Sequence, residues 1–177
     1  MRRFGEKKVL SDACACECVA ATLYRGRYGQ AEDKLKALDY FIRATELGSV
    51  SSPTEISTIY SEGGLITANT DRAVMFTKVA AVRGCIQGHH NLGAYECQRG
   101  NHEAGIRHWK IAAEGGSQIS LNALKTIYNT DGKMPGKEFI SKDDLDNLYR
   151  ACHEAQEEVS SEERMKHWGS KDDVFKC

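Results

Sequence analysis

Residues 72–84, RAVMFTKVAAVRG, decide how this chain folds, because the same pattern occurs twice more. Residues 36–48 read KALDYFIRATELG, and residues 104–116 read AGIRHWKIAAEGG. In each copy apolar residues follow one another at steps of three and four, which is typical of an amphipathic helix. A glycine closes each copy at the position where a helix ends with a left-handed residue.

The spacing of the copies indicates a repeat architecture. The small residues that anchor them, Ala44, Ala80 and Ala112, lie 36 and then 32 residues apart. A second helix precedes each copy at the same spacing, with apolar segments at residues 56–60, 92–96 and 124–128. A small residue stands four positions before each of these segments: Ser52, Gly88 and Ser120. One helix pair cannot bury its apolar stripe alone, so pairs at this period predict a solenoid.

We therefore predict an all-α fold, a right-handed α-α superhelix (solenoid) of about three and a half helix-pair repeats with a C-terminal capping helix. The repeats are expected near 12–48, 52–84, 88–116 and 117–158. The capping helix should begin after Ser141, which acidic residues follow, and continue through 158 with apolar residues at helical spacing. Residues 1–11 and 159–177 read as polar tails.

These residues carry a family resemblance. The pattern of a small residue, x3-Leu-Gly-x2-Tyr, a turn, and Lys-Ala-x2-Tyr/Phe-x3-Ala-Ala/Thr-x2-Gly resembles the Sel-one-like (Sel1-like) repeat, a longer relative of the tetratricopeptide repeat. The match is best in residues 36–48, 90–93 and 107–113 and covers roughly 12–158. Two positions depart from it: Glu96 replaces the expected tyrosine, and Gly105 replaces the first helical alanine. The resemblance implies a scaffold that binds other proteins and is rarely an enzyme.

Composition narrows the choice of partner. The 177 residues carry a formal net charge of −1, whereas nucleic-acid-binding domains are usually clearly basic, so we expect no nucleic-acid partner. No apolar run approaches the ~18–20 residues that span a bilayer, and the basic start lacks the apolar stretch of a signal peptide. The expectation is therefore a cytoplasmic or nuclear protein without a membrane association.

Three cysteines, Cys14, Cys16 and Cys18, form the first candidate for chemistry. Thiolates are good zinc ligands, but residues two apart on a helix point to different sides, and the usual Cys-x2-Cys spacing is absent. Cys16 also occupies the small-residue position of the first repeat. Packing thiols are the favoured interpretation, and metal or redox use of the cluster remains the alternative.

Histidines form the second candidate, since His89, His90, His102 and His108 stand near Cys97, Glu96 and Glu103. No His-Glu-x2-His motif is present, and His102 and His108 lie six residues apart, on different faces of a helix. No Gly-x-Ser-x-Gly elbow or phosphate-binding loop occurs either. We therefore expect no cofactor, no metal and no catalytic residue.

The leading hypothesis is a non-catalytic scaffold or adaptor that binds a peptide or protein on its concave face, which the first helices of the repeats would line. The candidate partner-binding residues are Glu55, Thr58, His90, Asn91, Ala94 and Lys125. Two alternatives stay open: a metal- or thiol-dependent enzyme, and the adaptor part of a ubiquitin-ligase-type protein. The sequence names no partner and no oligomeric state.

Overall fold

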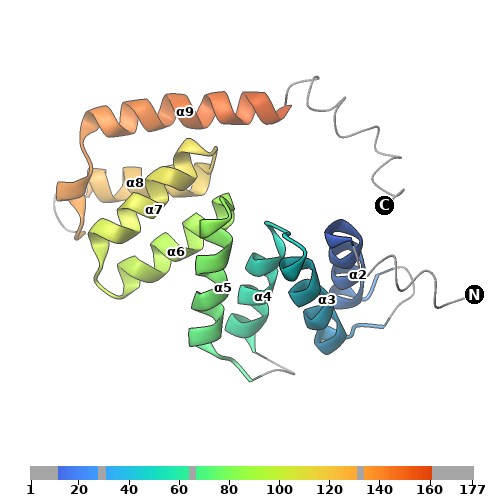
Figure 1. Ribbon diagram of the computed structural model, residues 1–177. Helices are drawn as coiled ribbons and strands as arrows, with labels where there is room; N and C mark the ends of the chain where they lie inside the picture. The colour runs from blue at the N-terminus through green and yellow to red at the C-terminus, as the bar shows by residue number, and fades with distance from the viewer. Residues whose placement is uncertain (1–11, 28–30, 64–66, 131–133, 161–177) are drawn as a thin grey trace, which may run out of the picture. The chain divides into compact units, whose positions relative to one another are not determined.

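A computed structural model describes residues 12–27, 31–63, 67–130 and 134–160, and it shows helices joined by short turns (Figure 1). The α-helices are α2 (Ala13–Arg25), α3 (Lys34–Glu46), α4 (Ser52–Glu62), α5 (Thr70–Val82), α6 (Ile86–Gln98), α7 (His102–Glu114), α8 (Gln118–Asn129) and α9 (Lys142–Ser160). A short 3-10 helix, η1 (Lys137–Phe139), precedes α9 and was not predicted. The described part contains no strand, so the all-α helical-repeat prediction is confirmed.

The helix ends follow from the residues that the sequence places there. The side chains of Asp12, Asp33, Asn69 and Ser117 accept hydrogen bonds from backbone N–H groups in the first turns of α2, α3, α5 and α8. Pro53 lies in the first turn of α4, where a missing N–H costs nothing. These capping residues thus mark where the helices begin.

The three anchor alanines take part in one recurring C-terminal bond. The carbonyls of Ala44, Ala80 and Ala112 accept from the N–H groups of Ser49, Cys85 and Ser117, at 2.9, 3.0 and 2.9 Å. Each bond spans a glycine with positive φ, namely Gly48, Gly84 and Gly116. This is the geometry that glycine adopts without strain at a helix end. The alanines themselves are fully buried, which explains why no larger residue stands there.

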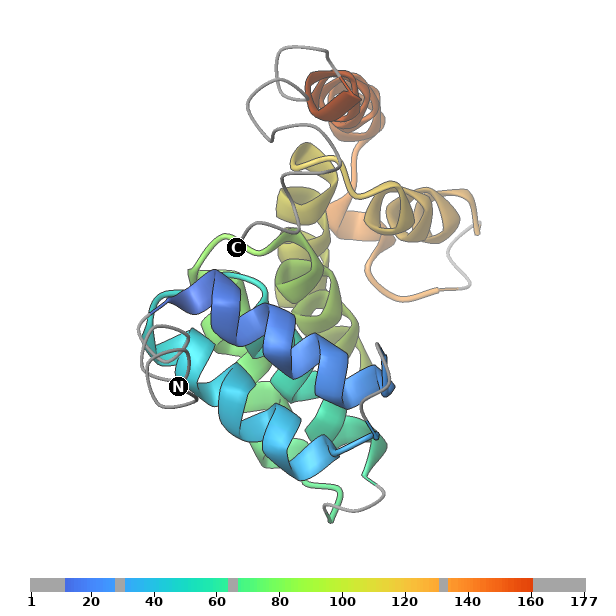
Figure 2. The same cartoon turned by 90° about the vertical axis from the view of Figure 1, so that its right-hand side faces the viewer.

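The described residues form two compact units, which divide between Cys85 and Ile86. In the first unit α2 pairs with α3, α4 pairs with α5, and α3 also packs on α4 (Figure 2). Its core is formed by Ala20, Ala37, Leu38, Phe41, Ile56, Ile59, Tyr60 and Ala73. Arg83 links the two pairs, because its Nη1 donates to the carbonyls of Thr45 (2.8 Å) and Ser49 (2.6 Å).

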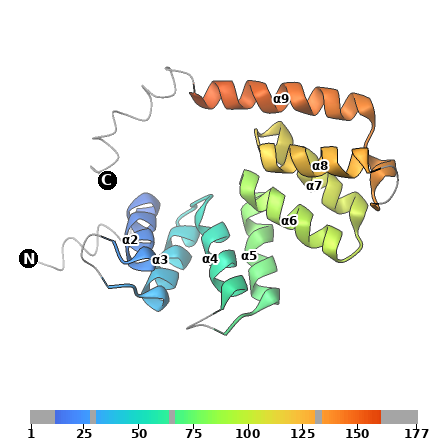
Figure 3. The same cartoon turned by 180° about the vertical axis from the view of Figure 1, so that it is seen from behind.

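In the second unit α6 pairs with α7, and α8 packs against α7. Helix α9 lies over α7 and α8 and closes the apolar face that they leave (Figure 3). The core here comprises Ile106, Ala113, Leu121, Leu124, Ile127, Ile140, Leu145, Leu148 and Cys152. The predicted capping helix is thus present, with Leu145, Leu148 and Cys152 turned inward.

Several boundaries can be compared with the prediction. The turn between α6 and α7 spans only residues 99–101, which accounts for the shorter 32-residue offset. Helix α9 continues to Ser160, two residues past the expected domain end. The predicted tail at 1–11 and residues 161–177 of the C-terminal one lie outside the described residues. Within the described ranges, no helix combines the length and apolar character needed to cross a membrane.

Candidate functional site

A small groove lies in the first unit between α2 and α4, the first helices of repeats one and two. Its volume is about 140 Å³, and it is lined by Glu17, Ala21, Tyr24, Arg25, Phe41, Ser51 and Glu55. Glu17, Ala21 and Tyr24 follow at steps of four and three, so they lie along one stripe of α2. Glu55, one of the six predicted partner-binding residues, therefore lies on a hollowed surface of the first helices.

One end of the groove is closed by a cluster of hydroxyl groups around Glu17. The Oε1 atom of Glu17 accepts hydrogen bonds from Ser49, Ser51 and Ser52, the last at 2.7 Å. Partial burial raises the pKa of this carboxyl group, but the three hydroxyl donors more than offset that effect and the pKa lies below its usual value. Glu17 therefore holds the N-terminal end of α4 against α2 as a carboxylate.

The other end is closed by Tyr24, whose hydroxyl donates to Oε2 of Glu62 at 2.9 Å. Burial and this hydrogen bond raise the pKa of Tyr24, and the charges of Glu62, Glu55 and Glu32 raise it further. Lys34 lies over the Tyr24 ring, 5.4 Å from its centroid. The groove is therefore a slot between two hydrogen-bonded ends, in a predominantly negative field.

Glu55 lies between these two ends. It is partly buried, and it forms no hydrogen bond or ion pair with any residue that the structure describes. Thr58, one turn further along α4, donates its hydroxyl hydrogen to the carbonyl of Thr54 at 3.1 Å, so its polar group is already satisfied within the helix. Of the two candidates in the first unit, only Glu55 offers an unused charge.

In the second unit, His90 packs between helices. Its Nδ1 lies 2.9 Å from the hydroxyl oxygen of the buried Ser120 on α8, and its carbonyl accepts from Nε1 of Trp109 at 3.0 Å. The imidazole also stacks on the Trp109 ring, with centroids 6.4 Å apart. Burial lowers the pKa of His90, which favours the neutral ring. These contacts make His90 an inter-repeat packing residue.

The other candidates of the second unit differ in how available they are. Asn91 on α6 accepts from Nε2 of Gln87 at 2.8 Å, which leaves its own amide N–H groups for a partner. Ala94 is partly buried on the same helix. Lys125 on α8 lies over the ring of Tyr149 from the capping helix, 4.7 Å from its centroid. Asn91 and Lys125 therefore both keep N–H donors that form no hydrogen bond with a described residue, and only Asn91 is neutral.

Packing explains one of the two departures from the repeat pattern, the glycine at position 105. Gly93 and Gly105 face each other where α6 crosses α7, and a Cβ built on Gly105 would lie 2.3 Å from Sγ of Cys97. A Cβ on Gly93 would lie 2.6 Å from Cδ1 of Trp109. Gly105 thus replaces the usual alanine because Cys97 and the carbonyl oxygen of Gly93, both on the neighbouring helix, occupy that space. Glu96 accepts from Nδ2 of Asn101 at 2.8 Å in the turn that follows.

The histidine candidates do not assemble into a metal centre within the described residues, where no group of three or more His, Cys, Asp and Glu side chains could hold an ion. His89 and His108 do meet, with their Nδ1 atoms 3.0 Å apart. Burial and the neighbouring His89 lower the pKa of His108. That distance is a hydrogen bond, in which one Nδ1 atom donates and the other accepts.

The cysteines of α2 separate as the helical spacing predicts. Cys16 is fully buried, and Cys14 and Cys18 are exposed. Burial raises the pKa of Cys16, which keeps it a thiol. No disulfide joins the six cysteines that the structure describes, and Cys177 lies outside them.

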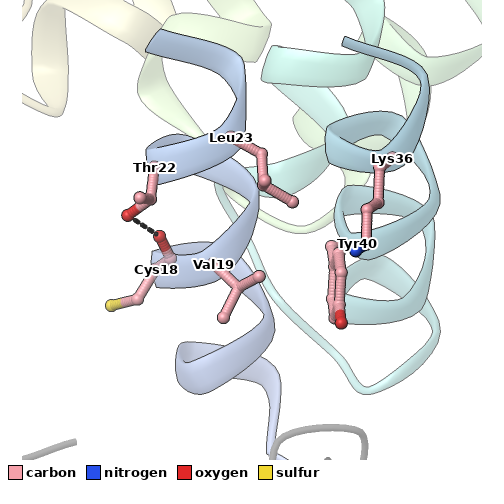
Figure 4. A pocket seen from close by; sticks show the side chains of 6 residues that line it. All are labelled: Cys18, Val19, Thr22, Leu23, Lys36 and Tyr40. Atoms are coloured by element: carbon pink, nitrogen blue, oxygen red, sulfur yellow. Dashed lines mark hydrogen bonds between the residues drawn. The ribbon is translucent and has the colours of Figure 1, made fainter. Parts of the chain in front are cut away.

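A second hollow, of about 360 Å³, is lined by residues of α2 and α3. Val19 and Leu23 point toward Tyr40 and Lys36 across it, whereas the sulfur of Cys18 points away from α3 (Figure 4). Its lining is mostly apolar. The sequence analysis did not predict this hollow, because its shape depends on how α2 and α3 pack together.

The comparisons with known proteins support the fold. No family model and no curated protein sequence matches the chain. Among solved structures, a Sel1 repeat protein from Oxalobacter formigenes is similar over 87% of this chain and 62% of its own, with 23% identity and a TM-score of 0.69. A protective antigen of uropathogenic Escherichia coli with an SLR fold is similar over 86% of this chain and 32% of its own, with 21% identity and a TM-score of 0.68.

The chain therefore has the Sel1-like repeat fold, and it spans less than two thirds of the length of either structure. In such a fold, stacked helix pairs form extended surfaces.

Proposed function

We propose that this protein is a scaffold that binds a peptide or protein segment along the face formed by the first helices of its repeats. The observation that carries the proposal is the slot between α2 and α4. There the partly buried Glu55 has no partner among the described residues, while hydrogen bonds satisfy the groups at both ends. Leaving a charge partly desolvated and unpaired is unfavourable, and a bound partner would relieve that cost.

The six candidate residues divide into two roles under this proposal. Glu55, Thr58, Asn91 and Ala94 would contact the partner, each within its own unit. His90 and Lys125 already contact Ser120 and Tyr149, so they would support the binding surface from beneath. A scaffold of this kind works as an adaptor, and its specificity depends on a few well-placed contacts.

The test places a bulky charge on the proposed face. The full chain is immobilised as wild type and as Thr58→Arg and Asn91→Arg variants, and proteins retained from a cell extract are identified by mass spectrometry and then titrated individually as purified partners. Matched controls are Met75→Arg on α5 and Ile111→Arg on α7, which change exposed residues of second helices. Loss of binding in the first two variants alone supports the proposal. Equal binding by all four rejects the first-helix face.

A further inference from the structure

The slot in the first unit has the shape and charge to bind one particular kind of side chain. Its two ends are fixed by Glu17 with its serine donors and by Tyr24 with Glu62. Both connections join matching ends of α2 and α4, so the two helices run in the same direction. Between them α2 contributes Ala21, whose small side chain leaves the middle of the slot open. The opening is thus a single side-chain site and not a continuous channel.

The surfaces of the slot differ in polarity. Its apolar lining includes Phe41 on α3, which is 3% exposed, and the methyl group of Ala21 on α2. Glu55 on α4 adds a carboxylate to the same lining. A long side chain with an apolar stem and a polar end would contact both kinds of surface at once.

The charges around the slot determine whether the polar end of the bound side chain should be positive or negative. Four carboxylates, Glu17, Glu32, Glu55 and Glu62, act in or near it, against two cations, Arg25 and Lys34. Lys34 is already paired with Glu32 at 3.4 Å. Arg25 also lines the slot, is exposed, and forms no ion pair with a described residue, so one cation stands against the carboxylates of Glu17, Glu55 and Glu62. The remaining charge around the slot is negative, and Glu55 is the lining carboxylate that has no hydrogen bond or ion pair with a described residue.

We infer that the slot between α2 and α4 binds a lysine or arginine side chain of the partner segment. The stem would lie on Phe41 and Ala21, and the cation would pair with the carboxylate of Glu55. A charge-assisted hydrogen bond of this kind is stronger than a neutral one and fixes the register of an extended segment. The inference rests on the proposed function, since it names the residue class that the partner presents to the first-helix face.

The experiment uses a displayed library of random linear peptides, selected in parallel on the full-length wild type and on the Glu55→Gln variant. Lysine or arginine should be enriched at one fixed position in peptides selected on the wild type only. In the best peptide, norleucine in place of that lysine keeps the stem without the charge and should weaken binding on the order of tenfold. Glu55→Gln should weaken binding of the lysine peptide equally, and the two changes together should cost little more than either alone.

Two further variants keep the outcome decisive. Ala21→Leu fills the slot without changing charge and should abolish the preference for a basic residue, while Glu114→Gln removes an exposed charge on α7 and should change nothing. Circular dichroism and a thermal melt confirm that each variant is folded. Peptides without a basic residue, or basic peptides that bind Glu55→Gln as tightly as wild type, overturn the inference. If the peptides that overturn the inference nevertheless fail to bind Thr58→Arg, the proposed function stands. If their binding survives both Thr58→Arg and Asn91→Arg, the proposed function fails as well.

Discussion

At the scale of single residues, the close crossing of α6 and α7 depends on Gly93. Alanine is intrinsically better than glycine inside a helix by about 1 kcal/mol, so Gly93→Ala would stabilise an open site. Here the new Cβ would lie 2.6 Å from Trp109 and 2.9 Å from the carbonyl of Gly105, where the backbone cannot yield. The cost of this overpacking should exceed the gain in helix propensity, so we expect a net loss of roughly 1–3 kcal/mol in the free energy of unfolding.

Urea denaturation followed by circular dichroism measures this difference. Gln98→Ala, at an exposed position at the end of the same helix, is the control and should leave the midpoint almost unchanged. A Gly93→Ala variant as stable as the wild type would show that the two helices can separate without cost.

A second residue-scale prediction concerns Glu17. Its pKa in the folded protein lies below the value of 4.5 for a free glutamate, because three serine hydroxyls donate to the carboxylate. A lowered pKa means that the stabilisation is fully present above about pH 4.5 and is lost as the pH falls through the folded value. Glu17→Gln should therefore cost roughly 1–2 kcal/mol at pH 7 and less in acid.

Unfolding free energies of the wild type and Glu17→Gln, measured from pH 7 down to pH 3, test that sign. Glu114→Gln serves as the charge-matched comparison. A gap between wild type and Glu17→Gln that stays constant, or that widens in acid, would contradict the assignment of the serine cluster to the ionised carboxylate.

At the scale of secondary-structure elements, α9 begins with a reciprocal cap. The N–H of Ser141 donates to Oδ2 of Asp144 at 2.9 Å, and the N–H of Asp144 donates to the Ser141 hydroxyl oxygen at 3.0 Å. Lys110 of α7 donates to the same Oδ2 at 3.0 Å, which fastens the start of the capping helix to the repeat below it. The hydrogen bonds from Ser141 and Lys110 lower the pKa of Asp144 to about 2.

We therefore expect Asp144→Asn to destabilise the protein by about 1 kcal/mol at neutral pH, since a partly exposed cap contributes modestly. The contribution is present above the ordinary pKa of 3.8 and should disappear as the pH falls toward about 2. Amide hydrogen exchange should show faster exchange in the first turns of α9. Asp143→Asn, at the neighbouring exposed position, should leave that exchange unchanged. If hydrogen exchange is uniform across α9 in both variants, then Asp144 does not anchor the start of this helix.

The elements are also where the sequence was most informative. The sequence analysis identified the repeat offsets of 36 and 32 residues, the glycines that end helices and the cap at Ser141, and the structure confirms them. The glycines and the cap act on residues that are close in the chain, which is why the sequence alone reveals them. The contact partners of Glu17, His90 and Lys125 could not be predicted from the sequence in this way. Each of these side chains contacts a residue of the next repeat or of the capping helix, which is distant in the chain. One clue was available: Ser52 follows Glu17 by 35 residues, close to the repeat offset, so the two occupy neighbouring turns of adjacent first helices.

At the scale of the whole molecule, each of the two units has its own buried cluster. Ile56 is fully buried in the first and Leu124 in the second. In helical-repeat proteins, stability is approximately a sum of local and nearest-neighbour contributions. Ile56→Ala and Leu124→Ala should each cost about 2–5 kcal/mol, and each should raise hydrogen exchange mainly in its own unit.

Exchange measured by mass spectrometry on the two variants distinguishes local from global unfolding. Faster exchange in α2–α5 for Ile56→Ala, with α8 and α9 nearly unaffected, is the expected pattern, and Leu124→Ala should give the reverse. Equal acceleration along the described helices in both variants would mean that the chain unfolds as one cooperative body.

The turns inside the helix pairs vary in length, whereas those between pairs are short. Residues 26–33 and 63–69 join α2 to α3 and α4 to α5, but only 99–101 join α6 to α7. The turns after α3, α5 and α7 each close with the hydrogen bond to an anchor alanine. Segments within pairs are thus where this architecture accepts differences in length, and a reporter sequence or affinity label for partner capture belongs between Gly63 and Asn69.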